Sequence, residues 1–388
     1  MLEFDNAEAG RGGRAEVCYT EPSAPESRVQ LTSTALGGAM RVLVTGHLGY
    51  IGTILAPVLA AAGHEVVGLD SDLYRKCTFG SPEAIAPLPT LERDIRDLTI
   101  DDLAGFDAVA HLAALSNDPL GDLDPELTLE INHRASVRLA SLARDAGVRR
   151  FVFSSSCSSY GAADDDRLLT EDGELQPVTI YGRSKVLTES DLNGLASDDF
   201  SPTSLRNATA YGMSPRHRFD VVLNNLVAWA VTTGRVHLKS DGSPWRPLVH
   251  VEDISRAFLA VLEAPRELVH AQAFNVGSSA ENYRVRELAE IVAETVPGTS
   301  LEFAAGASPD KRNYRVNCDR ITAVLGYRTR WTVRQGAAEL YEGYRDAGLT
   351  LADFEGPRYQ RIAHIRSLLA DGELDSSLRR RASVVRSA

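Results

Sequence analysis

The stretch that decides the fold spans residues 41–52 and reads RVLVTGHLGYIG. An apolar, partly β-branched run is followed by three glycines spaced three apart, Gly46, Gly49 and Gly52, and then by another apolar stretch. This order predicts a buried parallel strand, a tight turn and a helix whose N-terminus faces an anion. Because glycine has no Cβ atom, Gly46 can form the turn, Gly49 can admit a diphosphate, and Gly52 can let helix and strand pack closely. Glycine turns of this kind also occur in proteins that bind nothing, so the rest of the chain must decide.

Composition limits the classes of partner. Of the 388 residues, 44% are hydrophobic and 24% charged, which is ordinary for a globular enzyme with one large core or two lobes. The net charge of −12 argues against nucleic acid and against an anionic membrane. No apolar run reaches the roughly 20 residues that span a bilayer, and the start of the chain does not resemble a signal peptide. The four cysteines lack metal-ligand spacing, so we expect no metal site and a cytoplasmic location.

The pattern of apolar segments predicts the domain organisation. Residues 1–39 are rich in small and polar residues without periodicity, which indicates a disordered extension, and Met40 is a candidate natural start. From there strands alternate with helices, which predicts a doubly wound parallel α/β sheet covered on both faces. We expect strands at 41–45, 65–69, within 106–112, and at 150–154, 203–206 and 273–276, with helices at 54–62 and 127–146.

The looser pattern after residue 210 predicts a second lobe. The dinucleotide-binding domain is expected over 40–210, with 249–277 returning to it, and the smaller substrate lobe over 211–248 and 278–345. Residues 346–388 are predicted to form a helix and a flexible tail. The amphipathic part of that region, 358–370, is expected to pack on the body or on a second subunit.

Acidic residues at strand ends bear on the cofactor. Asp70 closes the second strand roughly 20 residues after the glycine turn, where a carboxylate accepts hydrogen bonds from both ribose hydroxyls and repels a 2′-phosphate. This position favours NAD over NADP, although an acidic residue in a strand-to-helix loop is also common without a ligand. Asp94 falls where a third strand would end and suits either an adenine amino group or a solvated loop.

A tyrosine and a lysine form the second candidate site. Tyr181 and Lys185 lie four residues apart, on one face of the expected helix. A nearby ammonium lowers the pKa of a phenol from about 10 towards neutrality, so the tyrosine can act as a general base. Hydroxyls at the end of the preceding strand, Ser154 to Ser156, can share the substrate oxygen. In an arbitrary helix the same pair would be a surface contact.

In this order the motifs resemble the extended short-chain dehydrogenase/reductase family, in its nucleotide-sugar epimerase/dehydratase branch. The resemblance covers residues 40–344 and rests on the glycine turn, HLAA at 111–114, FSSSCSSYG at 153–161, YGRSK at 181–185 and RPLVHVED at 246–253. It implies NAD as cofactor, a nucleotide-diphosphate sugar as substrate, and a homodimer. The cofactor-binding residues that it implies are Gly46, Gly49, Tyr50, Ile51, Gly52, Asp70, Asp94, Ile95, Leu112, Ala113, Ala114, Ser154, Tyr181 and Lys185.

The resemblance also implies roles on the substrate side. Tyr181 would be the catalytic base and acid, Lys185 would tune it, and Ser156 would be its hydroxyl partner. The implied substrate contacts are Ser156, Thr209, Asn225, Arg246 and Arg312. Thr209 stands where the family often has asparagine, and an extra residue near Arg312 blurs its alignment.

Two departures from the family pattern bear on the reaction. Sugar 4,6-dehydratases of this type carry an Asp-Glu pair where this chain has Cys157 and Ser158, and nucleotide-uronate decarboxylases carry Glu at the second position. Eliminating water needs an acid and a base, which a thiol and a hydroxyl supply poorly near neutral pH. Both activities are therefore disfavoured. Cys157 is expected to be a packing residue.

The leading functional hypothesis is an NAD-dependent nucleotide-sugar epimerase. It would oxidise a sugar hydroxyl, most simply at C4, and return the hydride to the opposite face of the transient ketone. A nucleotide 4-keto-sugar reductase or dehydrogenase would use the same residues, and a non-catalytic dinucleotide-binding sensor is a remote alternative. The loop at 214–220 is expected to bring two arginines and a histidine near the sugar, or to be solvated, and His47 is expected at the surface.

Overall fold

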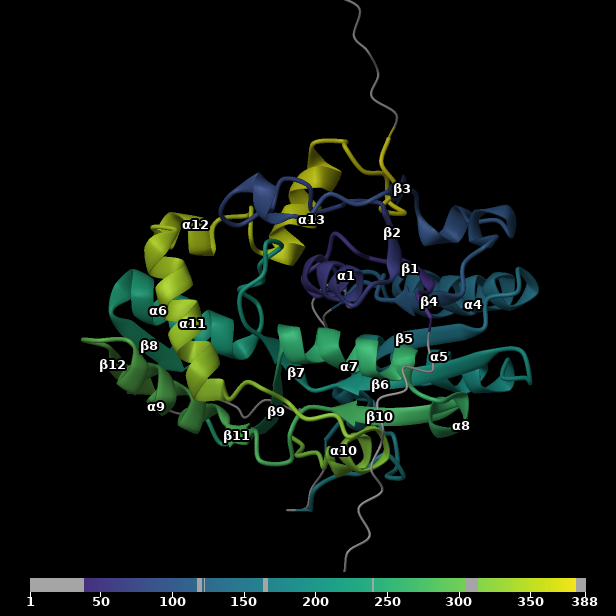
Figure 1. The fold of residues 1–388 in the computed structure, drawn as a ribbon. Helices are drawn as coiled ribbons and strands as arrows, with labels where there is room; N and C mark the ends of the chain where they lie inside the picture. Colours follow the sequence, from purple (N-terminus) through teal and green to yellow (C-terminus); the bar gives the residue numbers. More distant parts are fainter. Residues whose placement is uncertain are drawn as a thin grey trace, which may run out of the picture. The chain divides into compact units, whose positions relative to one another are not determined.

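A seven-stranded parallel sheet forms the centre of the protein (Figure 1). The computed structural model describes residues 38–116, 121, 123–162, 167–238, 241–303 and 313–381, all within one compact unit, Leu36–Ala388. In spatial order the strands are β10 (Gln272–Val276), β6 (Ser201–Asn207), β5 (Arg150–Ser156), β4 (Ala108–His111), β1 (Arg41–Thr45), β2 (Glu65–Asp70) and β3 (Thr90–Glu92). The strand order reverses between β1 and β4, and ligands of such sheets bind outside the carboxyl ends of the strands at this point. The predicted doubly wound fold is confirmed.

Helices cover both faces of the sheet. Val42 and Val44 of β1 belong to a core shared with α1 (Gly52–Ala61) and α7 (Val251–Glu263), whereas Leu43 belongs to the core on the opposite face. The second core includes residues of α4 (Ala135–Asp145) and α5 (Ile180–Gly194). Burial on both faces explains why the strands of a parallel sheet are almost continuously apolar.

The helix predicted at 127–146 begins earlier and is not uniform. Asp124 accepts a hydrogen bond from the backbone N–H of Leu127 and so caps α3 (Pro125–Leu129). A π-helical turn, Glu130–Arg134, then leads into α4. The helix ends before Gly147, whose φ of +86° suits glycine.

A second lobe packs around its own apolar core. Its helices α6 (Val222–Thr233), α9 (Val285–Thr295) and α11 (Val333–Asp346) are grouped beside the main sheet in Figure 1. Two small sheets accompany them: β7 (Thr209–Tyr211), β9 (Trp245–His250) and β11 (Asn282–Arg284) in one, β8 (Arg235–Leu238) and β12 (Ser300–Phe303) in the other. The short helices α8 (Arg266–Val269) and α10 (Asp319–Leu325) flank β10. No helix among the described residues is long and apolar enough to cross a membrane.

The C-terminal region differs from the flexible tail expected after its helix. Beyond α12 (Leu351–Glu355), α13 (Arg361–Ala370) packs its apolar face on the body, and the chain then folds back through a bridge between Leu374 and Arg380. Arg379 forms an ion pair with Asp97. Arg380 donates to the backbone oxygen of Asp72 at 2.5 Å. These partners hold residues 371–381 in place, whereas residues 1–37 and 382–388 lie outside the described part.

Candidate active site

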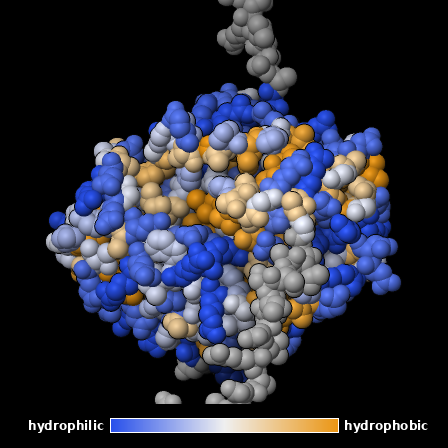
Figure 2. Space-filling model, in the orientation of Figure 1, coloured by the Kyte–Doolittle hydropathy of each residue, from blue (hydrophilic) through white to orange (hydrophobic). Residues whose placement is uncertain are grey.

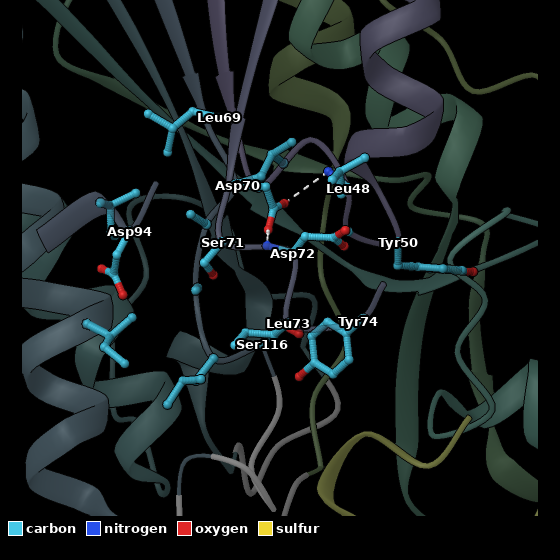
Figure 3. A pocket seen from close by; sticks show the side chains of 18 of the residues that line it. Leu48, Tyr50, Leu69, Asp70, Ser71, Asp72, Leu73, Tyr74, Asp94 and Ser116 are labelled. Carbon is cyan, nitrogen blue, oxygen red and sulfur yellow. Dashed lines mark hydrogen bonds between the residues drawn. The ribbon is translucent and has the colours of Figure 1, made fainter. Parts of the chain in front are cut away.

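The glycine turn lines a cavity of about 160 Å³ at the carboxyl ends of β1 and β2 (Figure 3). Gly46 has φ of +72°, and a Cβ atom there would lie 2.7 Å from the backbone N of Ala113. A Cβ atom on Gly52 would lie 2.3 Å from the backbone O of Gly46 and 2.5 Å from the Cα of His47. The turn therefore requires glycine at both positions.

His47 is buried, contrary to the expectation that it lies at the surface. Its exposed fraction is 3%, and its ring lies against Gly68, where a Cβ atom would be 2.3 Å from the imidazole. Its Nε2 lies 3.1 Å from the hydroxyl of Thr90 on β3. Burial lowers the pKa of His47.

Asp70 stands at the end of β2, facing the same cavity. Its carboxylate accepts hydrogen bonds from the backbone N–H groups of Asp72 at 2.7 Å and Leu48 at 3.0 Å (Figure 3). Burial raises the pKa of Asp70, and these hydrogen bonds lower it in part. A carboxylate has about four acceptor sites, so lone pairs remain for ribose hydroxyls. Because the turn has no Cβ atoms at its glycines, it leaves room for a diphosphate, and the carboxylate of Asp70 is placed to accept from ribose hydroxyls. Together these two features fit a dinucleotide.

Asp94 also lines the cavity, but its carboxylate is already engaged. It accepts from Nη2 of Arg96 at 2.6 Å and from the backbone N–H of the same residue at 2.9 Å. Although burial raises the pKa of Asp94, the hydrogen bonds from Arg96 leave it below its usual value. The arginine thus competes with any adenine amino group for this carboxylate.

The predicted cofactor residues fall into two groups. Those that line the small cavity are Gly46, Gly49, Tyr50, Ile51, Asp70, Asp94, Ile95, Leu112, Ala113 and Ala114. Ser154, Tyr181 and Lys185 line a second cavity of about 1110 Å³. The two cavities adjoin, because Ile51, Leu112, Ala114 and Arg218 line both. Gly52 lines neither cavity. It packs against the backbone of Gly46 and His47.

Tyr181 and Lys185 face the larger cavity from the first turns of α5. Thr179 starts this helix by accepting a hydrogen bond from the N–H of Gly182 at 3.1 Å. The Nζ of Lys185 donates to the backbone oxygen of Ser154 at 2.7 Å and lies 5.6 Å from the centroid of the Tyr181 ring. Burial lowers the pKa of Lys185 to about 7, although the nearby carboxylate of Glu189 raises it in part.

The depressed pKa of Lys185 predicts a pH-dependent stability. Between pH 7 and 10.5 this lysine is largely neutral when folded but protonated when unfolded, so the unfolded state binds more protons and stability rises with pH. In cofactor-free protein, we expect the wild type to gain about 1.4 kcal/mol per pH unit relative to Lys185→Met. Urea unfolding of both proteins at pH 7.5, 8.25 and 9 measures this difference. A constant difference across that range would contradict the burial of a titrating ammonium.

The serine-rich end of β5 leads into Cys157 and Ser158, the two positions at which the resemblance would place the acids of a dehydratase. The Oγ of Ser156 accepts hydrogen bonds from the hydroxyl of Ser158 at 2.8 Å and from its backbone N–H at 3.1 Å. Cys157 is fully buried, and its thiol donates to the backbone oxygen of Arg206 at 3.1 Å. Burial raises the pKa of Cys157, which keeps it a neutral packing residue. Neither position therefore offers a carboxyl group to the cavity.

The predicted substrate residues that the structure describes line the larger cavity. These are Ser156, Thr209, Asn225 and Arg246. The Nδ2 of Asn225 donates to the backbone oxygen of Phe219 at 2.9 Å, which fixes the start of α6. Arg312 lies outside the described residues.

The loop at 214–220 brings only one of its three basic side chains to the cavities. Arg218 lines both of them and binds Asp220 through two hydrogen bonds of 2.9 Å each. Arg216 instead forms an ion pair with Asp72 at 3.1 Å. His217 is fully buried among aromatic rings, which lowers its pKa to about 3. The expectation that all three approach the sugar is therefore wrong for two of them.

Several lining residues have no signal in the sequence. Trp229, Phe354 and Gln360 line the larger cavity, and Arg361 lines the smaller one. Three of these residues come from the C-terminal region, and only the fold brings that region back to the site. On the face shown in Figure 2, apolar residues gather near the centre and the border is mostly hydrophilic, as is typical of ligand clefts.

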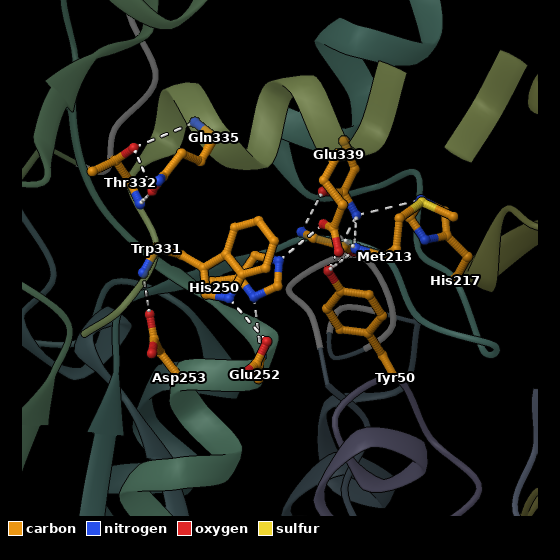
Figure 4. Close-up of polar contacts among 12 residues, drawn as sticks. Tyr50, Met213, His217, His250, Glu252, Asp253, Trp331, Thr332, Gln335 and Glu339 are labelled. Atoms are coloured by element: carbon orange, nitrogen blue, oxygen red, sulfur yellow. Dashed lines mark hydrogen bonds and ion pairs between the residues drawn. The ribbon is translucent and has the colours of Figure 1, made fainter. Parts of the chain in front are cut away.

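A buried polar cluster joins the glycine turn to the second lobe (Figure 4). The hydroxyl of Tyr50 donates to the backbone oxygen of Gly212 at 2.7 Å. The carboxylate of Glu339 on α11 accepts from the N–H of Met213 at 3.0 Å and lies 2.9 Å from the Nε2 of His250. The ring of His250 stacks on Trp331 with centroids 4.1 Å apart. These contacts hold the glycine turn of the main domain and α11 of the second lobe together beside the cavities. No cluster of potential metal ligands occurs among the described residues.

Comparisons with known proteins point to one family. A match to the model of the NAD dependent epimerase/dehydratase family covers residues 42–277. A UDP-glucose 4-epimerase of Mycolicibacterium smegmatis is 32% identical over 315 residues, which are 79% of this chain and 99% of that protein. The structure of MoeE5 in complex with UDP-glucuronic acid and NAD is 29% identical with a TM-score of 0.69, covering 79% of this chain and 99% of MoeE5. DesIV, a dTDP-glucose 4,6-dehydratase from Streptomyces venezuelae solved with NAD, is 26% identical with a TM-score of 0.70, covering 82% and 100%.

Proposed function

The chain belongs to the NAD-dependent epimerase/dehydratase family, as an NAD-dependent enzyme of the extended short-chain dehydrogenase/reductase type, and on this premise we propose that it is a nucleotide-sugar epimerase. The observation that supports this activity is the larger cavity, which brings Tyr181, Lys185 and Ser156 together beside the glycine turn. The positions of the dehydratase acids hold a buried thiol and a hydroxyl bonded to Ser156. The site therefore favours proton transfer at a hydroxyl over elimination or decarboxylation.

The chain's own residues supply the proton chemistry. Bound NAD supplies reversible two-electron oxidation of a sugar carbon, most simply C4. Tyr181 takes the proton of the sugar hydroxyl and later returns it. Lys185, in the fraction that is protonated near and below pH 7, favours the phenolate form of the tyrosine. Ser156 donates a hydrogen bond to the same sugar oxygen. A cavity of about 1110 Å³ leaves room for the transient ketone to turn its other face, as epimerisation needs.

A panel of nucleotide sugars tests the proposal. UDP-glucose and UDP-galactose come first, because the Mycolicibacterium smegmatis relative is a UDP-glucose 4-epimerase, followed by dTDP- and GDP-hexoses. We expect one sugar of the panel to be converted to its epimer without added NAD, as followed by proton NMR of the product. Turnover only with a keto-sugar and added NADH would instead identify a reductase. If no sugar were converted and none raised the melting temperature, the nucleotide-sugar substrate would be wrong.

We further propose a homodimer through the outer faces of α4 and α5, and a cytoplasmic location. The outward residues of α5, such as Arg183 and Ser190, are exposed in the single chain, as a dimer face would be before assembly. Cys77, Cys157 and Cys318 are free and buried, which suits a reducing compartment. Light scattering of the purified protein measures the oligomeric state.

A further inference from the structure

The C-terminal segment, residues 350–381, lies against the cofactor cavity and outside the stretch that the family model matches. Its apolar residues Ile365, Leu368 and Leu378 pack with Leu115 and Leu127 beside that cavity. Its polar residues bind backbone oxygens of the loop that follows β2. Arg358 donates to those of Lys76 and Thr78, and Tyr359 donates to that of Thr78. Arg380 donates to those of Ser71 and Asp72, and Nε2 of His364 lies 3.2 Å from that of Leu73. The segment thus holds the loop that forms one wall of the cavity.

Arg361, the first residue of α13, brings a charge into this wall. It lines the cavity together with Gly49 and Asp70, yet only 4% of the residue is exposed. Its guanidinium lies 3.7 Å from the ring centroid of Tyr74, and its Nη2 donates to the backbone oxygen of Arg216 at 3.0 Å. Its Nη1 is buried and has no hydrogen-bond partner among the described residues. A buried, charged donor without a partner is costly, so a ligand is expected to satisfy it.

The other charges around Arg361 favour an anion as that ligand. Arg218 lines the same cavity, but its Nε and Nη2 already donate to the carboxylate of Asp220. Among the described residues, no carboxylate forms an ion pair with Arg361. Burial lowers the pKa of Arg361 and the charge of Arg218 lowers it further, whereas Tyr74 and Asp220 raise it only in part. An anion in the cavity would compensate for both effects, and the backbone of the glycine turn, which lines the same cavity, favours the same kind of ligand.

We propose that Arg361 binds the diphosphate of NAD, so that the C-terminal segment completes the cofactor site. The dinucleotide diphosphate lies at the glycine turn in folds of this kind, and the guanidinium suits phosphate oxygens through charge-assisted hydrogen bonds. The C-terminal segment then forms part of the wall of the cofactor site and contacts the bound cofactor through Arg361. This inference concerns cofactor binding alone and does not depend on which sugar the enzyme converts.

The test compares ligands with and without a diphosphate. Arg361→Gln is set against Arg366→Gln, which removes an exposed arginine from the same helix. Calorimetry on protein freed of its cofactor measures the Kd of NAD, ADP and adenosine, and absorbance measures the NAD that each protein retains through purification. We expect Arg361→Gln to weaken NAD and ADP binding roughly 10- to 100-fold and adenosine binding less than about threefold. Arg366→Gln should change none of these affinities.

Two results would overturn the proposal. Equal weakening of NAD, ADP and adenosine would show that Arg361 acts only by holding the loop through Tyr74 and Arg216. Unchanged affinity for NAD and ADP would show that the diphosphate does not contact it. If Arg361→Gln does not fold, Arg361→Lys decides, because it keeps the charge but loses the planar guanidinium. The lysine variant should bind NAD and ADP more weakly than the wild type and bind adenosine equally well, and any other pattern counts against the proposal.

Discussion

Tyr181→Phe is expected to lower the turnover of the best nucleotide sugar about 10²- to 10⁴-fold while the affinity for NAD stays within about threefold. The substitution keeps the aromatic ring at the wall of the larger cavity and removes only the hydroxyl. Lys185, with its Nζ 5.6 Å from the ring centroid, would then have no phenol to tune. Steady-state kinetics give the turnover, and calorimetry on cofactor-free protein gives the Kd of NAD.

A matched substitution separates the chemical role of Tyr181 from a general effect of losing a phenol. Tyr341 lies on α11, lines neither cavity, and carries the guanidinium of Arg345 over its ring at 5.8 Å. Tyr341→Phe should therefore leave the turnover unchanged. Retention of more than a tenth of the wild-type rate by Tyr181→Phe would mean that another group takes the proton.

Local patterns in the sequence were enough to predict the sheet and the glycine turn. Inner strands such as β1 and β4 are buried on both faces, so their apolar runs are visible without knowing their neighbours. The edge strand β3 is largely exposed and has no such run, so its bounds were not predicted. Positions 46 and 52 must be glycine, because a Cβ atom there would clash with the backbone of Ala113 and of His47. The positions of Tyr181 and Lys185 on one helix face follow from helical periodicity alone.

What the sequence could not predict depends on pairs of distant residues. Nothing in the pattern around residue 361 indicates that its arginine returns to the loop after β2, since their contact depends on how the second lobe and α13 pack. His47 illustrates the same limit at short range, because its burial depends on Gly68 in the neighbouring strand. The buried ion pair between Glu189 on α5 and Arg206 on β6 was missed for the same reason.

That ion pair predicts a large effect on stability. The guanidinium of Arg206 donates to Glu189 through Nη2 at 2.7 Å and Nε at 3.0 Å, and its Nη1 donates to the hydroxyl of Tyr160 at 3.1 Å. The exposed fractions of the two side chains are 8% and 5%. Although burial lowers the pKa of Arg206, the hydrogen bonds and charge of Glu189 raise it above its usual value, so the guanidinium keeps its charge. Arg206→Met would leave the carboxylate buried without its cation.

We expect Arg206→Met to lower the free energy of unfolding by about 3–5 kcal/mol, as measured by urea denaturation. The double variant Arg206→Met/Glu189→Met should regain most of that loss, because two apolar side chains replace a buried ion pair at little cost. Arg144→Met, which breaks an ion pair with Asp145 at the surface, should change stability by no more than about 0.5 kcal/mol. A double variant no more stable than Arg206→Met would show that the loss comes from packing rather than from an uncompensated charge. The charge pairing would then not be what holds α5, and with it Lys185, against β6.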